Sequence, residues 1–460
     1  MTATAVPARH RHTAQEGSAP LHAGTTLIDR LATASALSER GRAVLSGLSW
    51  TTSAQALSVL VRLCSNLLLT RLLAPEAFGL VGTAFGVLAT LELLSDLGLQ
   101  PAVIRHERGG DLDVTSTAWW LGLARGVLLT GAAAAAAVPM AGFYEVPALA
   151  GLVVLMGTRP LLMSLRSPAY PLLRREMNYR VLFVDEVAQL LFGTGATLLM
   201  ASLTGSVWAI AVGVVVGAVA SVAVSWRACP RRVGRPSRPV AAGLLRFSGP
   251  VFLNTLVMAA WLKMDALLGL KLLGADAFGL YVVSLGLAGA AEALVVRVCD
   301  VYFSALAQMP AADRDGWHGV QVSRTARLAG PAFALSIVVA PIAVRFMYDE
   351  RYHPAGVLLA ILLARLAVRA FGQFRFQHLL AQGRVRSATV GYAVALAVQA
   401  SLIVPMAERY GPTGLAWSAL ASTAVVTLVQ ELGEWRRGTA TFAALAWVGL
   451  WAATGLAVAL

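Results

Sequence analysis

Apolar stretches of roughly 20 residues follow one another along most of this chain, separated by short polar breaks. An α-helix of that length crosses about 30 Å of hydrocarbon. The pattern therefore predicts about thirteen membrane-spanning helices, within a range of about twelve to fourteen. We expect them near residues 45–70, 78–103, 116–138, 147–166, 181–202, 206–226, 245–271, 278–302, 325–347, 355–379, 387–406, 412–433 and 440–460. The expected fold class is an all-α polytopic membrane protein.

The composition agrees with a membrane protein and argues against other classes. Of the 460 residues, 57% are hydrophobic and 13% are charged, whereas soluble domains carry about 25% charged residues. The net charge of +13 lies in short connections, without the basic polar domain that would suggest nucleic-acid binding. Cys64, Cys229 and Cys299 lack metal-ligand spacing. They are interpreted as packing residues, and neither a metal nor a cofactor is predicted.

Basic residues in the connections predict the orientation of the helices. If the N-terminus is cytoplasmic, the outside connections carry only Arg71, Lys271, Arg345, Arg351 and Arg409, and the inside connections carry all the other loop arginines. Residues 1–40 lack the apolar run of a cleaved signal peptide. They are predicted to form a disordered cytoplasmic tail.

A short sequence occurs twice. Arg71 to Leu80 reads RLLAPEAFGL, and Lys271 to Leu280 reads KLLGADAFGL, with six of the ten positions identical. The first copy lies between the first and second predicted spans, and the second between the seventh and eighth. The repeat unit is thus six helices, and an even number gives two parallel halves related by an axis along the membrane normal.

The motif itself is interpreted as a structural hairpin on the outer face, with Pro75 at the turn and Gly79 or Gly279 in close helix contact. Close helix contacts are also expected at the GxxxG pairs Gly82/Gly86 and Gly213/Gly217, because small residues let helix backbones approach each other. The expected organisation is a tail over residues 1–40, a six-helix half over 41–240, a second half over 241–435 and an additional helix over 436–460.

Three segments resemble one known family. They are LLLTRLLAPEAFGLVGTAFGVLATLELLSDLGLQPAVIRHE (Leu67 to Glu107), the stretch from PLLRREMNYR to GSVWAIAVG (Pro171 to Gly213), and LLRFSGPVFLNTLVMAAWLKMDALLGLKLLGADAFGLY (Leu244 to Tyr281). Together they cover most of residues 45–300, and LLAQGR (Leu379 to Arg384) adds a looser match. The chain resembles the Wzx-type polysaccharide flippases, in particular the colanic-acid-exporter branch of the MATE-like (multidrug/oligosaccharidyl-lipid/polysaccharide, MOP) superfamily.

The resemblance implies a V-shaped bundle of two six-helix halves around a cavity with alternating access. It implies a polyprenyl-pyrophosphate-linked oligosaccharide as cargo, moved from the inner to the outer leaflet of a bacterial cytoplasmic membrane. Membrane lipids are expected partners, and a polysaccharide polymerase and glycosyltransferases are candidate partners.

Charged residues inside the predicted spans are the best candidates for a site, because arginine at the bilayer centre costs roughly 2.5–3.5 kcal/mol on insertion scales. The cations are Arg62, Arg125, Arg159, Arg246, Lys263, Arg297, Arg365, Arg369 and Arg375. Nearly all are arginine, whose planar fork of donors matches phosphate oxygens. Such a set suits a diphosphate headgroup better than a lipophilic cation.

From this set we predict substrate-binding cavity residues. Arg62 and Asn66 share a helix face by their i, i+4 spacing. Arg365 and Arg369 have the same spacing, and their mutual repulsion predicts an anion nearby, either Glu431, Asp265 or a substrate phosphate. Arg125, Arg246 and Arg375 are interpreted as interfacial or snorkelling residues. The predicted cavity residues are Arg62, Asn66, Arg159, Arg297, Arg365 and Arg369.

Acidic residues in the spans allow two readings. Glu92 and Glu292 occupy equivalent repeat positions, and Asp96 and Asp265 lie at other depths. Buried carboxylates of this kind could couple transport to an ion gradient. Alternatively, each could pair with an arginine and hold helices together.

Enzyme functions are not supported, because the sequence contains no Gly-Lys-Ser/Thr, HExxH or GxSxG motif. The leading prediction is a flippase for lipid-linked oligosaccharide. The alternatives are a cation-coupled multidrug exporter of the same fold and a non-transporting scaffold of a polysaccharide assembly complex.

Overall fold

The computed structural model describes residues 56–95, 103, 108, 110–176, 178–246, 249–307, 309–310, 313–382, 384–432 and 439–459. The chain divides into two units, Met1–Ser49 and Trp50–Leu460. The first unit, and with it the predicted cytoplasmic tail, lies outside the described residues. The following description concerns the second unit alone.

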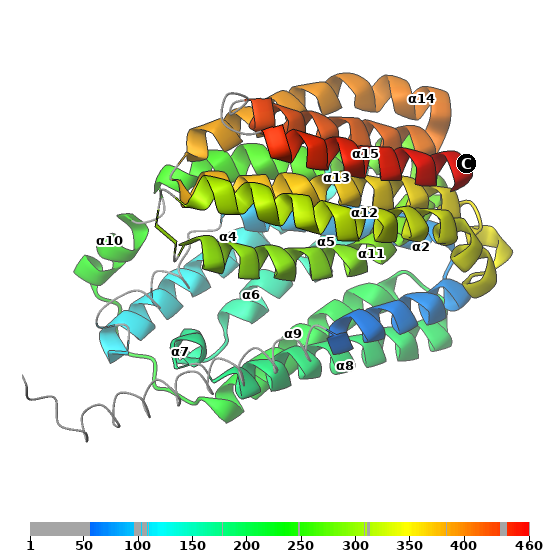
Figure 1. Cartoon of the computed structure of the whole chain (residues 1–460). Helices are drawn as coiled ribbons and strands as arrows, with labels where there is room; N and C mark the ends of the chain where they lie inside the picture. Colours follow the sequence, from blue (N-terminus) through cyan, green and yellow to red (C-terminus); the bar gives the residue numbers. More distant parts are fainter. Residues whose placement is uncertain are drawn as a thin grey trace, which may run out of the picture. The chain divides into compact units, whose positions relative to one another are not determined.

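All regular structure in the described part of the chain is helical (Figure 1). A first helix covers residues 56–72. The others are α2 (Pro75–Leu94), α4 (Leu112–Tyr144), α5 (Ala148–Met156), α6 (Arg159–Ser164), α7 (Tyr170–Arg175), α8 (Tyr179–Thr204), α9 (Trp208–Ala228), α10 (Arg238–Arg246), α11 (Gly249–Ala307), α12 (Arg314–Met347), the 3₁₀ turn η1 (Glu350–Tyr352), α13 (Ala355–Ala381), α14 (Val385–Leu432) and α15 (Thr439–Ala459).

Eight of the described helices are long and apolar enough to cross a membrane, and two shorter apolar helical segments cover Ala148–Ser164 and Ala444–Ala459. Two of the eight are bent at glycines. Gly274 inside α11 has φ 77° and Gly411 inside α14 has φ 60°, values that glycine adopts without the steric penalty of a side chain. The all-α, multi-pass prediction is confirmed, while the count of thirteen spans stays a prediction.

The bends explain how predicted spans relate to observed helices. The sequence predicts separate helices over 245–271 and 278–302, and these are the two arms of α11 on either side of Gly274. Likewise, 387–406 and 412–433 are the arms of α14 on either side of Gly411. The expected connections between these arms are therefore sharp bends and not loops. In each of them a single glycine, Gly274 or Gly411, has non-helical backbone angles.

Several predicted boundaries were wrong. The predicted span 325–347 is the apolar part of α12, which begins at Arg314, because hydropathy does not detect the polar first turns of a helix. The predicted span 147–166 is divided into α5 and α6 around Gly157, with Pro160 in the first turn of α6, a position where proline loses no helical hydrogen bond. The predicted second span continues to 103, but α2 ends at Leu94 and residues 96–102 lie outside the described part.

The two copies of the repeated motif pack directly on each other. A Cβ added at Gly79 would overlap the carbonyl of Ala275, and one added at Gly279 would overlap the carbonyl of Pro75. Further along, a Cβ at Gly86 would lie 2.7 Å from the Cβ of Ala266. The predicted close contact at these glycines is therefore present, and it joins α2 to α11.

A second glycine contact joins α8 and α9, which lie along each other in Figure 1. A Cβ at Gly217 would lie 2.9 Å from the carbonyl oxygen of Gln189, and a Cβ at Gly193 would lie 3.0 Å from that of Gly213. The predicted GxxxG pair Gly213/Gly217 thus brings two backbones together.

We expect the substitution Gly279→Ala to destabilise the protein, because the added methyl group meets rigid backbone and not a movable side chain. Overpacking of this kind costs about 1–3 kcal/mol. The measurement is the thermal unfolding midpoint in detergent. Gly131→Ala in α4 is the matched control, because a Cβ there meets nothing within 4 Å. Equal midpoints for the two variants would contradict the close contact.

Candidate functional site

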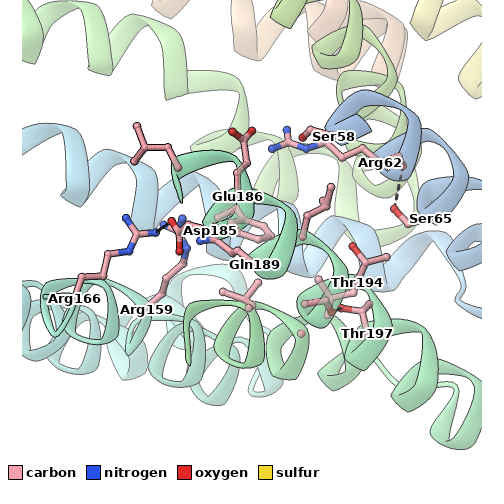
Figure 2. A pocket seen from close by; sticks show the side chains of 18 of the residues that line it. Ser58, Arg62, Ser65, Arg159, Arg166, Asp185, Glu186, Gln189, Thr194 and Thr197 are labelled. Atoms are coloured by element: carbon pink, nitrogen blue, oxygen red, sulfur yellow. Dashed lines mark hydrogen bonds and ion pairs between the residues drawn. The ribbon is translucent and has the colours of Figure 1, made fainter. Parts of the chain in front are cut away.

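A polar cavity of about 650 Å³ lies between the helix over residues 56–72 and helices α6 to α9 (Figure 2). Its walls carry two acids, an amide and several hydroxyl groups besides its basic residues. The arginines that line it are Arg62, Arg159, Arg166 and Arg174. The other polar lining residues are Ser58, Ser65, Tyr170, Asp185, Glu186, Gln189, Thr194 and Thr197. The cavity thus gathers polar and charged side chains inside a bundle of largely apolar helices.

The orientation of Arg166 is fixed by a network around the buried carboxylate of Asp185. The guanidinium Nη2 lies 3.2 Å from Asp185 Oδ2, and Nε donates to the hydroxyl of Ser221 at 2.8 Å. Ser221 and Tyr170 in turn donate to Asp185 at 2.5 and 2.7 Å. The Arg166 guanidinium also lies over the Tyr170 ring, 4.5 Å from its centroid. Tyr170 lies outside the candidate membrane spans. Burial raises the pKa of its hydroxyl, so the hydroxyl stays protonated and donates to Asp185.

Arg159 is held by an acid of the neighbouring helix. Its Nη1 lies 3.2 Å from Glu92 Oε1 in α2. Arg125 of α4 contacts the C-terminal end of α2. It donates to the Ser95 hydroxyl at 3.1 Å and to the Glu92 carbonyl at 2.8 Å. Glu92, Arg125 and Arg159 also line a second cavity of about 300 Å³ between α2, α4 and α6. Arg159 therefore reaches both cavities.

A third cavity, of about 250 Å³, lies between α11 and α13. Charged side chains supply much of its wall, namely Lys263, Asp265, Glu292, Arg365 and Arg369. Arg369 Nη1 lies 2.5 Å from Glu292 Oε1. This cavity is also lined by charged residues and is smaller than the first.

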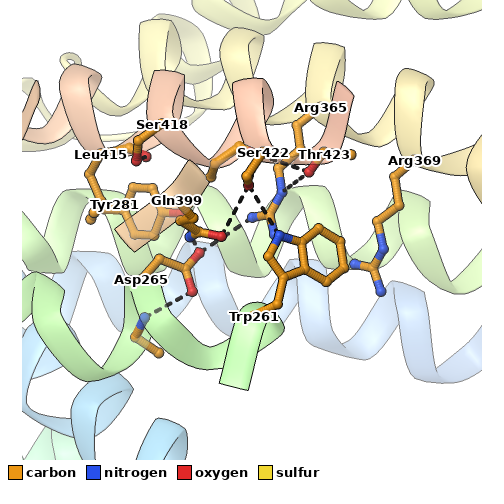
Figure 3. Close-up of polar contacts among 12 residues, drawn as sticks. Trp261, Asp265, Tyr281, Arg365, Arg369, Gln399, Leu415, Ser418, Ser422 and Thr423 are labelled. Atoms are coloured by element: carbon orange, nitrogen blue, oxygen red, sulfur yellow. Dashed lines mark hydrogen bonds and ion pairs between the residues drawn. The ribbon is translucent and has the colours of Figure 1, made fainter. Parts of the chain in front are cut away.

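Arg365 belongs to a buried network and not to an open surface (Figure 3). Its Nη1 lies 3.3 Å from Asp265 Oδ2, and its Nε donates to the Thr423 hydroxyl at 3.2 Å. The hydroxyl of Tyr281 donates to the same Asp265 oxygen at 2.6 Å. The ion pair thereby connects α11, α13 and α14, and every charge in it has a partner.

Residues 68–356 match a family of proteins described as "Polysaccharide biosynthesis protein". The chain belongs to this family. One curated relative is the succinoglycan biosynthesis transport protein ExoT of Rhizobium meliloti (strain 1021), 30% identical over 187 residues. The aligned region covers 39% of this chain and 37% of ExoT. The match thus spans little more than a third of that relative's length.

Solved structures show the fold of this polysaccharide biosynthesis protein. The lipid II flippase MurJ in an inward closed conformation matches with a TM-score of 0.68 at 11% identity, covering 89% of this chain and 92% of MurJ. An inward-facing multidrug resistance MATE family transporter of the MOP superfamily matches with a TM-score of 0.62 at 16% identity, covering 84% and 95%. Both structures are less than 25% identical to this chain, and their likeness confirms that it has the MATE-like fold.

The structure of this polysaccharide biosynthesis protein brings together some of the predicted cavity residues and separates others. Arg62 and Arg159 line the large cavity, and Arg365 and Arg369 line the small one. Asn66 instead accepts a hydrogen bond from the Tyr348 hydroxyl at 3.2 Å. Asn66 is not among the residues that line the large cavity beside Arg62, since its side chain faces Tyr348 at the C-terminal end of α12. Arg297 lies exposed on α11, away from the three cavities.

The acids proposed for ion coupling are found beside arginines. Glu92, Asp265 and Glu292 each form an ion pair with an arginine of another helix, which is the alternative reading that the sequence left open. Asp96 lies outside the described residues. Glu431, one of the three expected partners of the Arg365/Arg369 pair, lies 3.9 Å from Arg375.

Sequence reasoning missed Arg166, Arg174 and Glu186 as cavity residues. The two arginines were assigned to a cytoplasmic connection, where basic residues already had an explanation in the orientation rule. A usable signal was present, because Asp185 and Glu186 are adjacent acids in an otherwise apolar segment. Such acids require nearby cations, and the nearest cations in the sequence are those of this connection.

Proposed function

We propose that this protein is a flippase that moves a polyprenyl-pyrophosphate-linked oligosaccharide from the inner to the outer leaflet by alternating access. One observation carries the proposal: four arginines line a cavity of about 650 Å³ between apolar helices. Membership of a polysaccharide biosynthesis family supports the substrate class. The fold shared with MOP transporters supports the mechanism.

The chemistry of the cavity suits such a cargo. Guanidinium groups recognise phosphate oxygens through two parallel hydrogen bonds, and these attractions are stronger in a site of low dielectric than in water. Gln189, Thr194 and Thr197 line the same cavity and offer the donors and acceptors that sugar hydroxyls need. The volume lies within the range of about 300–1,000 Å³ typical of ligand sites. The polyprenol chain would stay in the lipid.

The proposal includes an orientation and a division of the chain. The N-terminus would be cytoplasmic, with one six-helix half over 41–240, a second over 241–435 and an additional helix over 436–460. The membrane would be a bacterial cytoplasmic membrane. In this orientation Arg166 and Arg174 lie near the inner face, where the diphosphate of a newly made lipid-linked sugar would enter.

A cation-coupled multidrug exporter is the second candidate, since an MATE transporter shares the fold and Asp185 and Glu186 line the same cavity. The network around Asp185 argues against it. That carboxylate already accepts two hydroxyl hydrogen bonds and pairs with Arg166. The excess of arginine over acid in the cavity would also repel a cationic drug.

The test is mass spectrometry of polyprenyl-pyrophosphate-linked oligosaccharides in a deletion strain, with the sidedness of the glycan determined by an impermeant label. A flippase predicts that the complete repeat unit accumulates on the cytoplasmic face. Normal polymer at the cell surface without accumulation would overturn the proposal and favour the exporter. A scaffold that supports a polymerase or glycosyltransferases would instead tolerate cavity charge reversal.

A further inference from the structure

Two ion pairs occupy equivalent places in the two halves of the chain. Glu92 of α2 pairs with Arg159 at 3.2 Å, and Glu292 of α11 pairs with Arg369 at 2.5 Å. The register of the repeated motif relates Glu92 to Glu292 at a separation of 200 residues. Their arginines lie on α6 and α13, which belong to the fourth predicted span of each half. Each half therefore contains the same acid–base pair between its second and fourth spans.

These two pairs differ from the buried Arg365–Asp265 pair in how exposed their side chains are. The side chains of Arg159 and Glu92 are each 35% exposed, and those of Arg369 and Glu292 are 26% and 32% exposed. By contrast, Arg365 and Asp265 are 6% and 3% exposed. A buried pair cannot exchange partners without exposing a charge to a medium of low dielectric. The two accessible pairs line cavities and can exchange.

We propose that Glu92 and Glu292 are internal counter-anions that occupy Arg159 and Arg369 in the empty carrier, and that anionic phosphate groups of the cargo displace them. This inference rests on the proposed function. A carboxylate and a phosphate present the same paired oxygens to a guanidinium fork, so one can take the place of the other.

The transport cycle gives a physical reason for such a device. A carrier must change conformation both loaded and empty, and an uncompensated arginine among apolar helices is unfavourable in either state. The cargo compensates the arginine charge on the outward step. The glutamate compensates it on the return, and re-formation of the pair assists release of the cargo.

The test uses the full-length protein in nanodiscs and undecaprenyl pyrophosphate as the probe, with the uncharged alcohol undecaprenol as a ligand control. We expect Glu92→Gln and Glu292→Gln to bind the probe about tenfold more tightly, and Arg159→Gln and Arg369→Gln about tenfold more weakly. Matched controls are Glu76→Gln and Asp276→Asn, which are repeat-equivalent exposed acids on the same two helices and outside the cavities. These controls should bind as the wild type does.

A transport measurement separates exchange from a merely structural role. In the glutamine variants, tighter binding and slower release should lower both KM and kcat for flipping. If a glutamine variant does not fold, Glu92→Asp or Glu292→Asp keeps the charge with a shorter reach and should show the same changes to a smaller degree.

The outcomes distinguish the two proposals. If the wild type binds the pyrophosphate lipid no better than undecaprenol, the proposed function fails. If the wild type binds it selectively but folded glutamine variants bind equally or more weakly, the counter-anion inference alone is overturned.

Discussion

Reversing the charge of Arg62 is expected to abolish flipping. Arg62 lies on the helix over residues 56–72 and lines the large cavity together with Asp185 and Glu186. In Arg62→Glu, a third acid would replace the cation of this wall and repel a diphosphate headgroup. Arg62 is exposed toward the cavity. Losing a hydrogen bond to a charged group costs about 1.5–3 kcal/mol, and the new acid adds repulsion, so the rate should fall by about one to two orders of magnitude. The measurement is the appearance of labelled glycan lipid in the outer leaflet of sealed vesicles.

Two comparisons make this result specific. Arg62→Lys keeps the charge but loses the fork of donors, so it should retain part of the rate. Arg71→Glu reverses a charge on the same helix at an exposed position outside the cavity, and it should flip like the wild type. Normal flipping by folded Arg62→Glu would show that this cavity does not carry the cargo.

Removing Asp265 is expected to have the largest effect on stability. In Asp265→Ala the guanidinium of Arg365 would stay buried. Its Nε would still donate to the Thr423 hydroxyl, but its charge would lose the Asp265 counter-ion. Breaking one side of a buried pair costs about 3–5 kcal/mol. The measurement is the free energy of unfolding in bicelles.

The double variant Asp265→Leu/Arg365→Met is the informative comparison, because replacing both charges by apolar groups is often neutral or stabilising. It should recover most of the stability that Asp265→Ala loses. A double variant as unstable as the single one would mean that the wider hydrogen-bond network, and not the charge pair, stabilises this region.

Much of the fold could be predicted because a membrane imposes a simple length rule on apolar segments. The places where prediction failed are polar. The first turns of α12, from Arg314, are helical although they contain Asp315 and His318, because His318 is buried against Tyr302 of α11 and His378 of α13. The helix α10 formed where only a basic connection was expected.

Some individual residues of the candidate site, such as Arg62 and Arg159, could be predicted from the sequence, but the pairing of the charged residues could not. An arginine such as Arg62 inside an apolar helix must face a cavity or a partner, and sequence alone shows that much. Which acid meets which arginine depends on tertiary packing. Arg365 and Arg369 are one turn apart, yet they pair with Asp265 and Glu292, residues 100 and 77 positions away in sequence. Helical spacing within one segment contains no information about that choice.

The reciprocal contact of the glycines gives a reason for the repeated motif. Gly79 packs on the backbone at 275, and Gly279 packs on the backbone at 75. Each copy of the motif therefore makes the same contact with the other copy. That is the pattern of an isologous dimer interface, here formed within one polypeptide. At such an interface a change in one copy must suit the surface of the other copy. The two sequences are therefore constrained to stay alike at this contact, while the cavities beside it are free to become as different as their volumes and charges now are.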